Sequence, residues 1–433
     1  MPVDIGEKIL MSRREFLQRV AVASASGIAL DNPLASAAAR PGIGAYGGKS
    51  LPAWIPDEGT WAFIGDNTIR NVIPSIQECP GCYTGNGPPA WLNWTGASYN
   101  PDDGVYGCYA LTLGGHGDGS DNSLKVFRFG ENHWVRINRP SGAPVNTAAN
   151  VYGEYIGYPA GVPAASHTYG LTQYLPRAFG GGHAGSTILP ILNAATAGAG
   201  AYGYAHACDH AAGMWSRWST NGLSNPPQVA SACHDGRGNY YVTGSGGTVS
   251  RLDNATRRWS TFSVTTSGIN LNLGGTNASG FHPRLRMWLV LDCVNAPFTL
   301  WGIYVDQVAQ GNGTWHRLVL TGTPPQHGTA GPSLEWCDWL GKFAVYEHVP
   351  GNAAAGTGQR ILDHIRWLTP PVTDVVTNSW RWSSEIFTSS ATLPQFAGIS
   401  QIYNRMQAIP VLRSLAFVES IDARMMLFRP RMS

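Results

Sequence analysis

The hydrophobic positions of this chain recur in short runs bounded by glycine and proline. In the run 124–129, Leu-Lys-Val-Phe-Arg-Phe, apolar side chains are interleaved with basic ones, which is typical of a strand with one well-buried face. A tryptophan is also followed three residues later by a large apolar residue at several places, which predicts a repeated unit. These pairs are Trp61/Ile64, Trp134/Ile137, Trp215/Trp218, Trp259/Phe262 and Trp315/Leu318.

The order of these pairs predicts a closed ring. Trp61/Ile64 precedes any complete unit, whereas the last unit, Tyr403–Arg429, ends without such a pair. A β-propeller whose final blade takes its outer strand from the N-terminal part of the chain would have this offset, because closure leaves no unpaired edge strand. The expected fold is therefore an all-β propeller closed by an N-terminal strand.

Six openings of innermost strands and six outer strands predict six blades. Seven blades require that the region 78–94 or the Ala/Gly-rich insertion 188–207 forms a degenerate unit, and this alternative stays open. The composition agrees with many short strands and tight turns, since the chain has 53 Gly, 29 Pro and 16 Trp and only 13% charged residues. Long amphipathic helices are not apparent.

One unit of the pattern resembles a known repeat. In 107–137 an apolar strand is followed by Gly114-Gly115, the run 124–129 and Trp134. This order resembles the kelch blade of galactose-oxidase-like propellers, and the resemblance covers most of 53–433. It implies a propeller fold but no particular activity.

The N-terminal segment resembles a twin-arginine export signal. Arg13-Arg14 lies before a short apolar stretch, 20–30, and an Ala-rich stretch, 34–39. The resemblance implies a signal peptide at 1–39, a linker at 40–52 and the propeller at 53–433, with export by the twin-arginine machinery to the periplasm or beyond. The mature chain would have no membrane span. An amphipathic N-terminal helix is the alternative, and translation could begin at Met1 or at Met11.

The net charge limits which partners are expected, and the cysteine positions predict one disulfide. The net charge is +2 and the basic residues are scattered, so we expect no nucleic-acid partner and a monomer. Cys79 and Cys82 enclose Pro-Gly in a loop, and an oxidising destination favours a disulfide between them. The other five cysteines are isolated, and most are expected to be buried and inert.

Several polar residues fall at equivalent places in the repeat. Three histidines are expected to open innermost strands and two follow the double glycines, while a glutamate and a tyrosine occupy similar openings. Because the second strand of a blade runs back beside the first, these positions should lie at one mouth of the channel. The predicted ligand-binding residues are His116, His167, His183, His234, His282, Glu335 and Tyr403.

Two interpretations of the histidines remain open. In one, each imidazole caps a turn; in the other, His167, His234 and His282 hold a transition metal or the whole set binds a polar ligand. The copper-radical site of galactose oxidase-like enzymes, with two tyrosines and two histidines, is not supported, because the chain has no Tyr-His dipeptide. No cofactor is therefore assigned.

The function expected from the sequence is ligand binding by an exported propeller. The ligand would be a carbohydrate or a cell-envelope component, and loop aromatics could stack on sugar rings. Those aromatics are Trp91, Trp94, Tyr152, Tyr155, Tyr158, Tyr202 and Tyr204. A metal-dependent enzyme, either an oxidoreductase or glycan-active, and a protein-interaction scaffold are the alternatives, and the sequence leaves open whether the protein is an enzyme.

Overall fold

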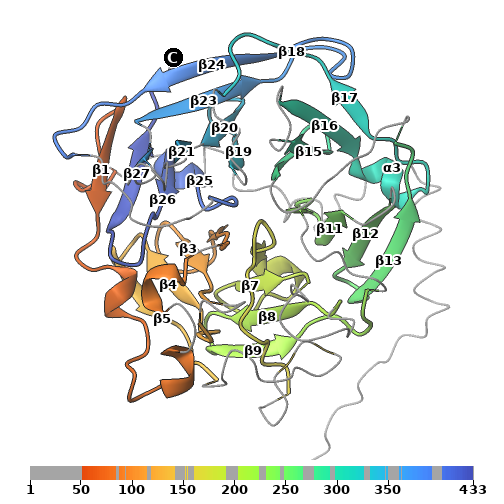
Figure 1. Cartoon of the computed structure of the whole chain (residues 1–433). Helices are drawn as coiled ribbons and strands as arrows, with labels where there is room; N and C mark the ends of the chain where they lie inside the picture. The colour runs from red at the N-terminus through yellow and green to blue at the C-terminus, as the bar shows by residue number, and fades with distance from the viewer. Residues whose placement is uncertain are drawn as a thin grey trace, which may run out of the picture. The chain divides into compact units, whose positions relative to one another are not determined.

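The chain folds as a six-bladed β-propeller (Figure 1). The computed structural model describes residues 51–83, 87–92, 94–114, 119–141, 152, 154, 160–191, 203–223, 231–243, 248–266, 277–292, 298–325, 332–346, 348–349, 360–361, 363–392 and 402–432. The signal peptide expected at 1–39 and all but 51–52 of the linker lie outside these ranges. The described residues belong to one compact unit, Tyr46–Ser433.

Each blade is an antiparallel sheet numbered here from its innermost strand outward. Blade 1 contains β2 (Ser98–Asn100), β3 (Cys108–Leu111), β4 (Lys125–Arg128) and β5 (His133–Arg136). Blade 2 contains β6 (Gln173–Leu175), β7 (Ser186–Leu189), β8 (His206–Asp209) and β9 (Met214–Arg217). Blade 3 contains β10 (Ala232–His234), β11 (Asn239–Thr243), β12 (Thr248–Asp253) and β13 (Arg258–Ser263).

The remaining blades follow the same order. Blade 4 contains β14 (Ala278–His282), β15 (Met287–Asp292), β16 (Thr299–Tyr304) and β17 (His316–Leu318). Blade 5 contains β19 (Ser333–Cys337), β20 (Lys342–Tyr346), β23 (His364–Thr369) and β24 (Trp380–Ile386). Blade 6 contains β25 (Gln407–Ile409), β26 (Ser414–Phe417), β27 (Met425–Arg429) and, as its outer strand, β1 (Thr60–Ile64).

The other elements are short. A fifth strand, β18 (Leu320–Thr321), pairs in parallel with β24, and β21 (His348–Val349) pairs with β22 (Arg360–Ile361). The one α-helix in the described ranges is α3 (Val305–Ala309). The 3-10 helices are η2 (Ile69–Asn71), η3 (Pro80–Tyr83), η4 (Pro88–Ala90), η5 (Arg177–Phe179) and η8 (Pro410–Leu412). No described helix is long and apolar enough to cross a membrane.

The ring closes as the repeat pattern predicts. β1 pairs with β27 in antiparallel register, from Thr60 opposite Arg429 to Ile64 opposite Met425. The innermost strands contact one another in order around the axis, and β25 contacts β2. The region 78–94, which would have supplied a seventh blade, instead contains η3 and η4. Six blades are therefore confirmed.

The hydrophobic core is divided among the seams between blades. Each of six buried clusters joins side chains of two neighbouring blades, such as Tyr109 with Leu427 at the seam between blades 6 and 1. The repeated tryptophans explain the outer part of the seams. At five of the six seams, a tryptophan in an outer strand or directly before it donates a backbone hydrogen bond to the segment that follows the outer strand of the preceding blade.

The acceptor at these seams is a carbonyl or an asparagine side chain. Trp61, Trp315 and Trp380 donate to the carbonyl oxygens of Thr388, Thr265 and Val319 at 2.7 to 3.0 Å. At the other two seams the acceptor is the Oδ1 of Asn67, 2.7 Å from the Trp134 N, and the Oδ1 of Asn221, 2.8 Å from the Trp259 N. Five of the six outer strands are thus held near their first residues by the blade before them.

Candidate functional site

The predicted ring of histidines does not form at one mouth of the channel. We call the face at which the innermost strands begin the start face, and the face at which they end the end face. His234 and His282 are the last residues of β10 and β14, so they lie toward the end face, and the expectation that they open their strands is wrong. The cause is local: the Asp235 side chain accepts hydrogen bonds from the Arg237 N and Asn239 N and closes the β10–β11 turn directly after His234.

His183 also lies toward the end face, in the connection between β6 and β7, and it is exposed. The three glycines before it, residues 180–182, therefore lie in the hairpin between the first two strands of blade 2. The prediction that His183 follows the second strand is wrong. His116 lies outside the described residues. His282 behaves as a turn cap, since its Nδ1 accepts a hydrogen bond of 3.3 Å from the Leu285 N.

Two of the predicted residues, His167 and Tyr403, do come together, at the start face. They belong to an axial aromatic cluster that consists of Trp94, His167, Tyr169 and Tyr403. The ring centroid of Trp94 lies 6.0 Å from His167 and Tyr169 and 5.6 Å from Tyr403, and the rings of Tyr169 and Tyr403 are 5.1 Å apart. Trp94 is half-buried, whereas the other three side chains are buried.

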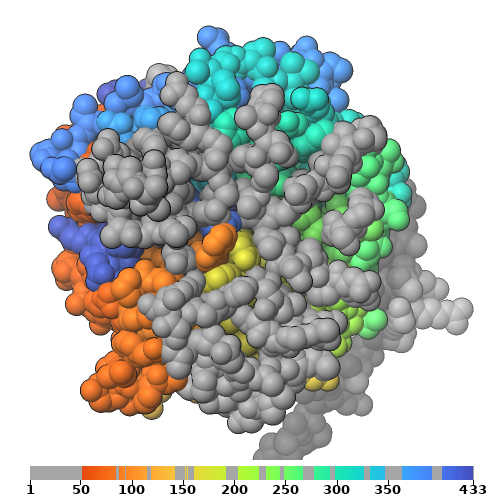
Figure 2. Space-filling view, in the orientation of Figure 1, coloured from red at the N-terminus to blue at the C-terminus, as the bar shows by residue number. Residues whose placement is uncertain are grey.

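The cluster is built by three consecutive blades. Trp94 precedes β2, His167 and Tyr169 precede β6, and Tyr403 precedes β25. In Figure 2, described atoms from these orange, yellow and blue parts of the chain lie next to one another near the centre of the face in view. The segments that lead into blades 6, 1 and 2 therefore meet near the propeller axis.

The backbone holds this cluster in an unusual conformation. Trp94, Tyr169, Tyr403 and Asn404 have φ values of 43 to 59°, and they are four of the ten non-glycine residues with positive φ in the described chain. Gly96 is packed so closely that a Cβ there would lie 2.0 Å from the Tyr169 carbonyl oxygen. Left-handed backbone at bulky residues is costly and gathers at ligand and catalytic sites, so this concentration supports a functional role.

Behind the cluster, polar side chains cross the channel. Asn404 donates from Nδ2 to the Ser279 carbonyl oxygen at 2.8 Å, and its Oδ1 accepts from the Leu334 N at 3.3 Å. Glu335, another predicted site residue, lies within β19, and its Oε1 accepts from the Gln407 Nε2 at 3.1 Å. Glu335 thus forms part of the network that links innermost strands and does not lie at a strand opening.

Two buried ionisable side chains that the sequence analysis did not single out lie beside this region. Arg405 is buried and donates from Nη1 to the Leu92 carbonyl oxygen at 2.7 Å, and burial lowers its pKa to about 10. Burial raises the pKa of Glu419 to about 8, although Arg405 opposes this shift. The Oε2 of Glu419 and the hydroxyl of Tyr403 are buried and have no hydrogen-bond partner among the described residues.

Three of the other loop aromatics pack against the protein. Trp91 is fully buried and contacts Tyr83, so it is a core residue and not an exposed platform. Tyr152 and Tyr204 pack edge to face, and the guanidinium of Arg217 lies 3.6 Å from the Tyr152 ring centroid. Tyr155, Tyr158 and Tyr202 lie outside the described residues. Among the described loop aromatics, Trp94 is therefore the one that lies at the axis.

The cysteines and the metal-capable side chains lie elsewhere. Cys79 and Cys82 are joined by a disulfide, and the described free cysteines, Cys108, Cys208, Cys233 and Cys337, are buried. Within the described ranges, one group of three side chains, Asp103, Cys108 and His210, could hold a metal ion, and it contains none of the histidines predicted as ligands. A surface cavity of about 420 Å³ opens between blades 4 and 5, beside Val319 and Trp382.

No family model and no curated protein matches this sequence. Solved structures with some likeness include an auxiliary nutrient binding protein from Bacteroides ovatus, with 11% identity, a TM-score of 0.43, and coverage of 86% of this chain and 78% of that one. A second, from Bacteroides thetaiotaomicron, has 10% identity, a TM-score of 0.39, and coverage of 79% and 69%. Likeness at this level carries no argument about function.

Proposed function

We propose that this protein is an exported, kelch-like β-propeller that binds a polar ligand, a carbohydrate or cell-envelope component, at the axial aromatic cluster. The observation that carries the proposal is the half-exposed indole of Trp94, held by His167, Tyr169 and Tyr403. An aromatic ring fixed in one orientation offers a flat apolar face on which a sugar ring can stack. Little conformational entropy is lost on binding, because the packing already fixes the ring.

The polar groups beside the cluster suit a ligand rich in hydroxyl groups. The Tyr403 hydroxyl can donate or accept a hydrogen bond, and the Glu419 Oε2 can accept one. Leaving such buried groups unpaired costs free energy, which pairing with a ligand or with water would recover. The metal-dependent alternative that relied on His167, His234 and His282 is not retained, because these residues lie at opposite ends of the innermost strands.

The binding proposal is tested by replacing Trp94. We expect Trp94→Ala to weaken binding of an oligosaccharide at least tenfold and Trp94→Phe to weaken it less, because stacking depends on ring area. A panel of neutral and amino-sugar oligosaccharides, including peptidoglycan fragments, would be screened by calorimetry against the parent protein. Trp54→Ala, at another half-buried tryptophan, is the matched control. A parent protein that binds no member of the panel would overturn the carbohydrate assignment, and equal binding by Trp94→Ala would overturn the site.

Export is a separate part of the proposal and rests on the resemblance of Arg13-Arg14 and the following apolar and Ala-rich stretches to a twin-arginine signal. We expect replacement of both arginines by lysine to trap the precursor in the cytoplasm. Fractionation of cells that express the full chain measures this directly. Undiminished periplasmic protein in the double variant would contradict the assignment of the signal.

A further inference from the structure

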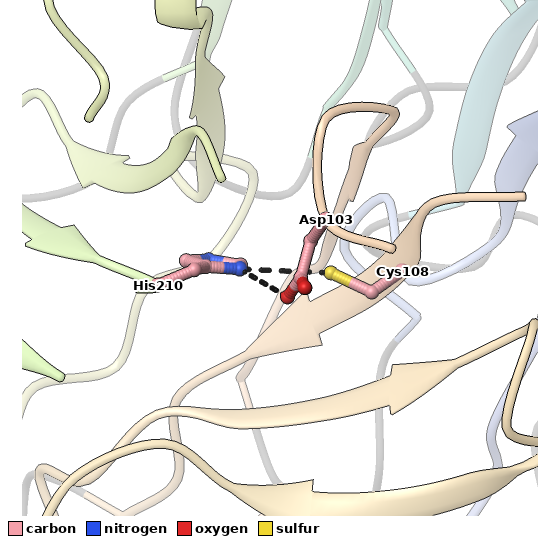
Figure 3. A group of neighbouring side chains, drawn as sticks. All are labelled: Asp103, Cys108 and His210. Carbon is pink, nitrogen blue, oxygen red and sulfur yellow. Dashed lines mark hydrogen bonds and ion pairs between the residues drawn. The ribbon is translucent and has the colours of Figure 1, made fainter. Parts of the chain in front are cut away.

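A buried group of three different metal-binding side chains joins blades 1 and 2 toward the end face (Figure 3). Asp103 lies in the β2–β3 turn, Cys108 is the first residue of β3, and His210 follows β8 directly. The Nδ1 of His210 lies 2.8 Å from the Oδ2 of Asp103 and 3.7 Å from the Sγ of Cys108. All three side chains are buried, and they point toward one another across the seam.

Neighbouring side chains orient two members of this group. The Nε2 of His210 lies 2.9 Å from the Oγ1 of Thr187, so its other ring nitrogen faces Asp103 and Cys108. The Oδ1 of Asp103 lies 3.3 Å from the Nε of Arg128, which leaves Oδ2 directed at the histidine. Metal-binding histidines and carboxylates in proteins are held by outer partners of this kind.

The seam between blades 3 and 4 is joined by an ion pair that cannot bind a metal ion. The turn aspartate of blade 3, Asp235, forms an ion pair with Arg286 of blade 4, with 3.1 Å between Oδ2 and Nη2. A guanidinium is a permanent cation and cannot bind a metal ion. In blade 1 the matching turn carries Asp103, which meets an imidazole and a thiol, and both of these are metal ligands.

We propose that Asp103, Cys108 and His210 form a site for a divalent transition-metal ion of borderline softness, zinc first, that links blades 1 and 2. One nitrogen, one sulfur and one carboxylate oxygen match the ligands that zinc takes. On binding, Cys108 releases its thiol proton to solvent, and the imidazole proton resides on Nε2, which donates a hydrogen bond to the Thr187 hydroxyl. Water supplies the fourth ligand of the tetrahedron.

The present distances are close to those that zinc needs. Tetrahedral ligands at usual zinc distances stand roughly 3.6 Å apart for sulfur and nitrogen and roughly 3.3 Å apart for nitrogen and oxygen. The Sγ–Nδ1 separation of 3.7 Å already fits. His210 and Asp103, now 2.8 Å apart, must separate by roughly half an ångström. A rotation of the Asp103 side chain, which sits in a turn and not within a strand, provides this change.

The test uses the full chain, stripped with chelator and titrated with Co²⁺ and with Zn²⁺. We expect one equivalent of Co²⁺ to bind with a thiolate-to-cobalt charge-transfer absorption, and Zn²⁺ to displace it. Cys108→Ala should abolish that absorption. His210→Gln should lower the affinity for Co²⁺ at least tenfold.

Cys208→Ala is the matched control, because Cys208 is also a buried free cysteine of the same seam but lies outside the group. Circular dichroism and melting of each variant without metal show whether it is folded. The proposal is overturned if the folded parent shows no thiolate-to-cobalt band, since the three side chains would then form only a hydrogen-bonded contact. It is also overturned if Cys108→Ala retains the band or if Cys208→Ala loses it.

Discussion

The two buried ionisable side chains near the axis, Arg405 and Glu419, differ in whether a hydrogen bond offsets the cost of their burial. Arg405 is buried and bonded to the Leu92 carbonyl oxygen, whereas the Oε2 of Glu419 has no partner among the described residues. Burial raises the pKa of Glu419 to about 8, so the carboxyl group is mostly protonated near neutral pH. A protonated carboxyl group can donate a hydrogen bond, which extends the range of ligand groups that this region can recognise.

Glu419 should make stability fall as the pH rises. Between its ordinary pKa of 4.5 and the folded value of about 8, the folded chain retains a proton that the unfolded chain has lost. The free energy of unfolding should therefore decrease across this range, by on the order of 5 kcal/mol. Urea unfolding at pH 5 and pH 8.5 would measure the loss.

Glu419→Gln removes the titration, so this variant should gain stability relative to the parent as the pH increases. The exposed Glu131→Gln is the control and should follow the parent. If the parent and Glu419→Gln keep the same difference in stability at both pH values, the raised pKa is wrong.

The sequence predicted the positions of individual candidate residues only in part. His167 and Tyr403 precede innermost strands, as the repeat pattern indicated. The positions predicted for His234 and His282 are wrong, because each histidine ends a short innermost strand and does not begin one. Arg405 and Glu419 carry no local signal: an isolated charge in a loop is usually solvated, and only the packing around it shows burial.

At the scale of elements, the seams explain why tryptophan recurs. A tryptophan lies at the first residue of each outer strand or one residue from it, and at five of the six seams its N–H is bound by the preceding blade. The indole then packs into a seam, as Trp134 does in the buried cluster that joins blades 6 and 1 and contains Leu427. The spacing from the tryptophan to the next large apolar residue thus recurs because each blade packs at a seam in the same way. For this reason the spacing predicted the blades.

Asn221 should be a stabilising residue despite its place in a loop. Its Oδ1 accepts from the Trp259 N at 2.8 Å and its Nδ2 donates to the Trp259 carbonyl oxygen at 3.2 Å. Asn221→Ala should lower the free energy of unfolding by roughly 1–3 kcal/mol, because two hydrogen bonds are lost and both backbone groups need new partners. Denaturant unfolding checks this value.

Asn221→Asp separates the two hydrogen bonds, since it keeps the acceptor and loses the donor. Its stability should lie between those of the parent and Asn221→Ala. Asn312→Ala, at an exposed asparagine, is the control and should change stability by less than about 0.5 kcal/mol. A loss in Asn221→Ala no larger than in this control would contradict the role assigned to the seam.

At the scale of the whole molecule, closure by β1 makes blade 6 a composite of both ends of the propeller. Trp61 is buried between blades 5 and 6, in the cluster that contains Trp367 and Phe428. Removing β1 exposes that cluster and the edge of β27, which is an unpaired strand prone to association. The sequence alone predicted this closure, because Trp61/Ile64 precedes every complete repeat unit and the last unit has no such pair.

Deletion of residues 51–66 should destabilise the whole ring and not only blade 6. Each blade packs on two neighbours, so the loss at one seam is transmitted to both sides, unlike in an open repeat array. Hydrogen exchange should show lost protection in β11 and β15, which lie far from β1 along the ring.

A synthetic peptide of residues 51–66 should restore protection, and a peptide with Trp61→Ala should restore less. If β11 and β15 in the deleted protein keep the protection of the parent, the blades fold independently and the closed ring is not the cooperative unit.

The pairing of β1 with β27 also fixes when the protein can finish folding. The two strands are roughly 370 residues apart along the chain, so at usual rates of translation the first waits roughly 20 to 70 s for its partner. During that time every nascent chain has an exposed tryptophan-bearing strand near its N-terminus and an open seam. The completed ring therefore requires that translation has passed Arg429, and any chain terminated before β27 would expose an unclosed edge that proteases and chaperones can recognise.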